Sequence, residues 1–167
     1  MPDLVTHTTL GYLVRDRRWD VHVLILFMIG TMLPDVFSRT FIILFKDYRW
    51  FFHAWHTPVV IILLSALISL LFVSDMRKQV FKFLLLGSAF HCLLDLFQTG
   101  ISDTAYLWFF PFSSKFDFQI GLFWAEDTLS LTPLFVLLFL ISYKWESKII
   151  SFFRRKFGKN SAKPGKS

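Results

Sequence analysis

Hydrophobic residues occur in four long runs along the chain, separated by short polar or charged segments. The runs cover about residues 21–45, 58–74, 80–98 and 128–143. Each approaches the roughly 20 apolar residues that a helix needs to cross the core of a bilayer, and shorter helices are tolerated in a bundle. In lipid a helix satisfies its own backbone hydrogen bonds, so we predict four membrane-spanning helices.

Composition supports a membrane protein over a soluble enzyme or binding domain. Hydrophobic residues make up 54% of the 167 residues, and 22 of them are Phe. A soluble domain of this size could not bury so much apolar surface. The fold class that we predict is all-α: a polytopic integral membrane helical bundle of about four spans. A short N-terminal helix, about 4–14, and an interfacial C-terminal helix complete it.

The first run contains a predicted break. The segment GTMLPDVFSR places Gly30 and Pro34 in the middle of the run and adds the charges of Asp35 and Arg39. Proline lacks the backbone N–H that continues a helix. We therefore expect the helix to end near Leu33 and an irregular turn to follow.

Lys and Arg are distributed unevenly between the loops. The start of the chain, the 75–82 loop and the tail contain 14 of them, whereas the loops of the opposite side contain Lys46, Arg49 and Lys115. By the positive-inside rule, the 75–82 loop and the C-terminus are cytoplasmic.

The C-terminal tail mixes cations with aromatic residues. Its sequence YKWESKIISFFRRKF is typical of an interfacial helix on anionic lipid, and nucleic-acid binding is the weaker interpretation. We therefore divide the chain into a membrane-embedded domain, 1–143, and a basic amphipathic and disordered cytoplasmic tail, 144–167.

Ionisable residues inside apolar runs are costly and are candidate functional residues. His91 and Asp95 are four residues apart in a helical run, so they share one face within about 6 Å. Together they can hold a metal ion, or they can form a buried hydrogen-bonded pair within their own helix.

Further histidines and an aspartate are predicted at the same membrane edge. With the 75–82 loop cytoplasmic, Asp35, His53 and His56 lie at the outer ends of the first two spans, level with the outer half of the third. If RDRRWD is a cytoplasmic turn, His7 rises about 15 Å from it toward them. Imidazoles with carboxylates suit a divalent metal, foremost Zn²⁺, as one ion or a two-metal cluster that activates water for hydrolysis.

These residues lie in motifs that resemble a known family. PDLVTHTTLGYLV, IGTMLPDVFSR, HAWHTP, HCLLDLFQTG and YLWFFPFS, in this order, resemble the YdjM-like family of inner-membrane metal-dependent hydrolases, a distant relative of zinc-dependent phospholipase C. The resemblance runs from about residue 2 to 133. It implies a metal site in a bacterial or archaeal cytoplasmic (inner) membrane. The ligands that it implies are His7, Asp35, His56, His91 and Asp95.

Other residues have competing interpretations. Arg39 can pair with Asp35, four residues before it, or bind a substrate phosphate. Trp55 can receive the apolar part of a lipid or belong to the interfacial aromatic belt. Glu126 and Asp127 precede the last span, where acids favour a helix N-terminus, so we prefer that role to an additional catalytic acid.

Three functions fit this pattern. The first is a metal-dependent hydrolase of a lipid or lipid-linked phosphoester at the outer edge of the bilayer, with Asp35 and Asp95 in catalytic roles. The second is a metal or proton carrier, which needs polar groups that continue toward the cytoplasm. The third is a non-catalytic subunit with a structural metal.

The predicted topology can be tested by labelling. In a chain without Cys92, single cysteines at positions 114 and 161 should react with an impermeant thiol reagent from opposite faces of the membrane. Spheroplasts and inverted vesicles separate the two faces. Reaction of both positions from one face would overturn the orientation.

Overall fold

The computed structural model describes residues 4–45, 47, 54–99, 109, 111–112 and 120–157. Its helices are α1 (Leu4–Val14), α2 (Val21–Leu44), the short 3-10 helix η2 (Ala54–His56), α4 (Pro58–Leu70), α5 (Ser74–Leu96) and α6 (Ala125–Phe157). Two-residue strands, β1 (Gln98–Thr99) and β2 (Phe123–Trp124), pair in parallel. The prediction of a helical fold is confirmed for these residues.

Among the residues that the structure describes, two helices are long and apolar enough to cross a membrane. They are α2, with 24 residues, and α5, with 23 residues, while the apolar α4 has only 13. These two are candidate spans by length and composition, and the prediction of about four spans is not confirmed. Large hydrophobic side chains such as Ile43, Leu67 and Leu70 are exposed on the helices, as expected of surfaces that face lipid.

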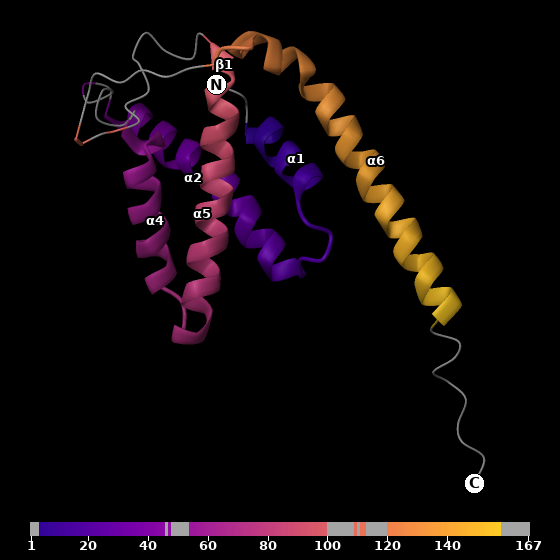
Figure 1. Cartoon of the computed structure of the whole chain (residues 1–167). Coiled ribbons are helices and arrows are strands. Elements are labelled where there is room, and N and C mark those ends of the chain that lie inside the picture. Colours follow the sequence, from indigo (N-terminus) through magenta and orange to yellow (C-terminus); the bar gives the residue numbers. More distant parts are fainter. Residues whose placement is uncertain are drawn as a thin grey trace.

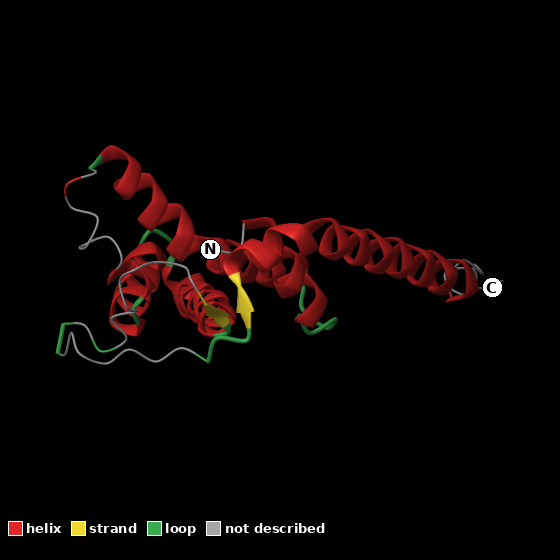
Figure 2. Cartoon of the chain, turned by 90° about the horizontal axis from the view of Figure 1, so that it is seen from above, coloured by secondary structure: helices red, strands yellow, loops and turns green. Residues whose placement is uncertain are grey.

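α5 packs against both α2 and α4, and α1 packs between α2 and α6 (Figure 1). Seen from above, α6 extends away from the other helices toward the C-terminus (Figure 2). α6 is a single helix of 33 residues, where we predicted a span and then a separate interfacial helix. The segment after residue 143 contains neither Gly nor Pro before position 158, so nothing in the sequence stops the helix.

The backbones of α2 and α5 meet at two glycines. A Cβ atom added to Gly87 would lie 2.2 Å from the carbonyl oxygen of Phe27, and one added to Gly30 would lie 2.5 Å from that of Leu84. Helices in membranes approach this closely where small residues face each other. This contact determines how near the polar residues of α2 and α5 come to one another.

The predicted break near Leu33 is wrong, because α2 continues through Pro34 to Leu44. Pro34 cannot donate to the carbonyl of Gly30, one turn earlier. The Ser88 hydroxyl of α5 donates to that carbonyl instead, at 3.1 Å. The neighbouring helix thus replaces the missing hydrogen bond, as membrane helices with internal proline require.

α1 is held against α6 by polar contacts at both of its ends. Near its start, the hydroxyls of Thr6 and Thr132 lie 3.3 Å apart. Near its end, Tyr12 donates to the carboxylate of Glu146 at 3.0 Å, and Arg15 forms an ion pair with the same carboxylate. These contacts position a helix that is too short to span a membrane by itself.

Replacing Gly87 by alanine should destabilise the protein by about 1–3 kcal/mol, because the added methyl group overlaps a backbone carbonyl that cannot move aside. The melting temperature in detergent should fall measurably. Gly11→Ala is the matched control, since the three atoms nearest to its Cβ would all belong to side chains, of Thr31 at 3.1 Å, Phe27 at 3.4 Å and Met28 at 3.8 Å. Equal melting temperatures for the two variants would contradict the proposed backbone contact.

Candidate metal centre

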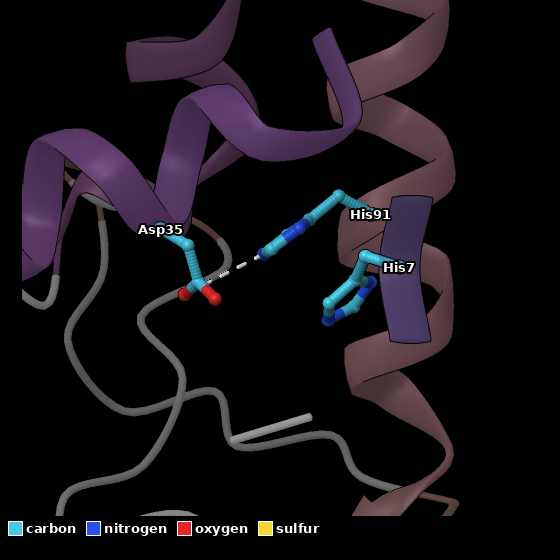
Figure 3. A group of neighbouring side chains, drawn as sticks. All are labelled: His7, Asp35 and His91. Atoms are coloured by element: carbon cyan, nitrogen blue, oxygen red, sulfur yellow. Dashed lines mark ion pairs between the residues drawn. The ribbon is translucent and has the colours of Figure 1, made fainter. Parts of the chain in front are cut away.

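Five ionisable side chains from four elements converge in the interior. They are His7 of α1, Asp35 of α2, His56 of η2, and His91 and Asp95 of α5. Their exposed fractions are 0%, 1%, 3%, 0% and 1%, respectively. Figure 3 shows three of them, His7, Asp35 and His91, with their side chains directed toward one another. The structure therefore brings together residues that are separated by up to 88 positions in sequence.

Each aspartate of the cluster faces two imidazoles. Asp95 lies 3.4 Å from Nε2 of His7 and 3.3 Å from Nε2 of His91. Asp35 Oδ1 lies 3.2 Å from Nε2 of His56 and 3.9 Å from Nε2 of His91. These four distances are at or beyond the upper limit of an N–H···O hydrogen bond. Ligand atoms about 2.0–2.1 Å from a tetrahedral Zn²⁺ lie about 3.3 Å apart, so the spacing resembles that of a coordination shell.

Two overlapping triads have ligand atoms within 4.8 Å of one another. One is His7, Asp35 and His91, and the other is His56, His91 and Asp95. His91 belongs to both, so it is the centre of the cluster. This arrangement provides donors for one ion, and its two carboxylates provide donors for a second.

A hydrogen bond fixes the orientation of His91. Its Nδ1 donates to the carbonyl oxygen of Thr31 at 2.7 Å, and a carbonyl can only accept. Nε2 of a neutral His91 is therefore an acceptor, and it faces carboxylate oxygens that are also acceptors. Such contacts repel unless a cation lies between them. This pairing of Nδ1 with a carbonyl is common for metal-binding histidines, because it presents Nε2 to the metal.

Polar atoms without hydrogen bonds concentrate at the cluster. Among the described residues, both ring nitrogens of His7, Nε2 of His91 and both carboxylate oxygens of Asp95 are buried and make no hydrogen bond. Burial of such atoms without partners costs free energy, most of all for charged groups. A proton can satisfy one of these contacts, whereas a divalent ion satisfies several at once. The residues present therefore fit a metal ion.

Arg39 extends the cluster toward the surface. Its guanidinium Nη2 lies 3.2 Å from Oδ2 of Asp35, and its side chain is 39% exposed. The local pair expected from the four-residue spacing is thus present. The partial exposure also leaves the guanidinium accessible from outside the cluster.

Trp55 supports the position of its neighbour His56. Its ring stacks on Phe37 and Phe41 of α2, with centroids 5.4 and 5.2 Å apart. In addition, the carbonyl of His56 accepts a hydrogen bond from Cys92 Sγ of α5 at 3.4 Å. These contacts attach η2 to both helices of the glycine contact and place the His56 ring beside Asp35.

The remaining predicted site residues lie elsewhere or outside the described part of the chain. His53 lies outside the described residues. Glu126 and Asp127 belong to the first turn of α6, and their side chains are not described. His22 lies apart from the cluster, with its side chain 83% exposed beside Asp20.

Two contributions to the site carried no recognisable sequence signal. The carbonyl of Thr31 orients His91, and the hydroxyl of Ser88 supports the helix just before Asp35. Backbone acceptors do not depend on side-chain identity, and isolated serines are common in apolar helices. Pro34 offers the one indirect signal, because it implies a free carbonyl one turn earlier.

Comparison with known proteins relates the chain to a family. A family model described as YdjM inner membrane protein matches residues 3–154, which include all five residues of the cluster. No curated protein and no solved structure matches the chain.

Replacement of His7, His91 or Asp95 by alanine should lower the metal content of the purified protein sharply. Each change removes a donor from the cluster, and even changes outside the ligand shell cost about 10–100-fold in metal affinity. Elemental analysis after dialysis against a weak chelator measures the content. His22→Ala should match the wild type. Full metal content in His91→Ala would refute the site, because His91 belongs to both triads.

Proposed function

The chain belongs to the YdjM inner membrane protein family, and from this premise we propose that it is a membrane-bound metal-dependent hydrolase of a lipid or lipid-linked phosphoester. The observation that carries the proposal is the buried cluster of three imidazoles and two carboxylates. Its atoms lie at the spacing of metal ligands, and several are buried without a hydrogen bond. We expect Zn²⁺, as one or more ions, because imidazole nitrogen with carboxylate oxygen suits it.

A divalent ion held in this cluster would lower the pKa of a bound water and neutralise an anionic phosphoryl oxygen. The chain's own residues then have separate roles. His91 and Asp95 hold the centre of the site, while Asp35 connects it to Arg39. Asp35 or Asp95 can orient the attacking water by accepting a hydrogen bond from it.

Arg39 is the group that we propose for substrate binding. A guanidinium pairs with the oxygens of a phosphate in a bidentate manner. Its contact with Asp35 holds this charge beside the cluster, and its exposure allows a substrate to reach it. Trp55 contributes to the lipid-facing edge, although its stacking on Phe37 and Phe41 also gives it a role in holding His56.

A lipid substrate is supported by an apolar groove on the other side of α1. The groove has a volume of about 430 Å³ and is lined by residues of α1, α2 and α6, among them Val5, Met32, Phe139 and Leu140. Thr8 also lines it, but its hydroxyl donates to the carbonyl of Leu4 within the helix. Such a surface suits a hydrocarbon chain, and the same helix carries His7 into the cluster.

The carrier function has weaker support. Between the cluster and the start of α5, the buried hydroxyls of Ser69 and Ser88 donate to helix carbonyls, whereas that of Ser65 makes no hydrogen bond to a described residue. One unoccupied hydroxyl does not form a continuous path for an ion or a proton. We therefore retain the carrier and the structural-metal functions only as alternatives to hydrolysis.

Hydrolysis can be tested with metal-loaded protein in liposomes that contain phospholipids or polyprenyl phosphates. The wild type should release a water-soluble phosphate product, and Asp95→Asn should release it at least about tenfold more slowly, because one carboxylate of the site is lost. His22→Ala is the control and should retain the wild-type rate.

The metal content of each variant is measured in the same preparations. If wild type and Asp95→Asn release equal product from every lipid while metal is bound, hydrolysis of these phosphoesters is wrong. The structural-metal or carrier function would then replace it.

A further inference from the structure

Thr57 has a buried hydroxyl that no part of the described chain satisfies. The residue is 2% exposed, and its Oγ1 makes no hydrogen bond to any described residue. Thr57 is the N-cap of α4, where a threonine side chain ordinarily accepts a hydrogen bond from a backbone N–H of the first turn. Here the side chain makes no such bond. The hydroxyl therefore lacks both solvent and its usual local partner.

Thr57 is the immediate neighbour in the chain of a residue of the metal centre. It directly follows His56, whose ring lies 3.2 Å from Asp35. The carbonyl that joins the two residues accepts the hydrogen bond from Cys92, which is adjacent to His91 in α5. The backbone at Thr57 is thereby attached to the helix that provides two of the five cluster residues.

The chemistry of the cluster leaves a role for such a hydroxyl. Carboxylates and metal-binding imidazole nitrogens present lone pairs, so they repel an anionic oxygen unless a cation intervenes. A substrate phosphate or a water also needs hydrogen-bond donors. Arg39 provides donors on the Asp35 side, and a threonine hydroxyl can donate one hydrogen bond on the His56 side.

We propose that Thr57 is a positioning residue whose hydroxyl donates a hydrogen bond to the water or phosphate oxygen that enters the metal centre. The inference rests on the proposed metal centre, and it does not require that the protein hydrolyses its ligand.

Ser65 provides the internal comparison. Its hydroxyl is also buried without a described partner, but it lies eight residues farther along the chain, about 12 Å away along the α4 axis.

The experiment measures binding of inorganic phosphate to the metal-loaded protein in detergent by titration calorimetry. Thr57→Val keeps the shape of the side chain and removes the donor, so phosphate should bind about tenfold more weakly. Thr57→Ser restores the donor and should bind within about threefold of the wild type. Ser65→Ala should bind phosphate as the wild type does. The metal content and the melting temperature of the metal-free protein should be unchanged in Thr57→Val, which separates positioning from a structural role.

Three outcomes would overturn the inference. Wild-type phosphate affinity in Thr57→Val shows that the hydroxyl does not contact the ligand. Equal losses of phosphate affinity in Thr57→Val and Thr57→Ser show that the packing of the side chain, and not its hydrogen-bond donor, is responsible. If the wild-type protein takes up no metal, both this inference and the proposed metal centre are wrong. In contrast, if phosphate binding changes as expected but the protein releases no product from lipids, the role of Thr57 is supported and only the hydrolase function is wrong.

Discussion

Two carboxylates and three imidazoles that share one buried volume need compensating positive charge, and their spacing is one that could hold a metal ion. Each of these side chains is removed from water, and burial of an uncompensated charge is among the largest costs that a fold can carry. The orientation of His91 strengthens this requirement. Its Nδ1 donates a hydrogen bond to the carbonyl of Thr31, so Nε2 of the neutral ring is an acceptor that faces two carboxylates, which are also acceptors. The packing of the surrounding helices can be understood as a means of holding these donors at the distances that a metal ion accepts.

The contact between α2 and α5 allows the side chains of the cluster to come within these distances of one another. Gly30 and Gly87 let the two backbones touch, and Asp35 and His91 follow these glycines by about one turn on their respective helices. The same contact brings Ser88 to the carbonyl that Pro34 leaves without a donor. One close approach thus allows both the internal proline and the cluster, and a larger residue at either glycine would disturb both.

The imidazole of His7 belongs to α1, a helix whose position depends on its neighbours. α1 has 11 residues, and isolated helices of this length are marginal in water. Its contacts with α6 through Thr6, Tyr12 and Arg15 hold it beside α2, where His7 stacks on His91 with ring centroids 3.9 Å apart. Although no described side chain of α6 belongs to the cluster, this helix helps to determine the position of His7.

Composition and local spacing by themselves determined the helical class, its apolar character and the two pairs within single helices, His91 with Asp95 and Arg39 with Asp35. The rise and rotation of a helix set the separation of residues four positions apart, so these contacts need no knowledge of other elements. The continuity of α2 through Pro34, the bond from His91 to Thr31 and the place of His7 were decided only by the tertiary structure. Each depends on a group from a neighbouring helix, and the distance between helices is a property of their packed surfaces, which no single segment of sequence contains.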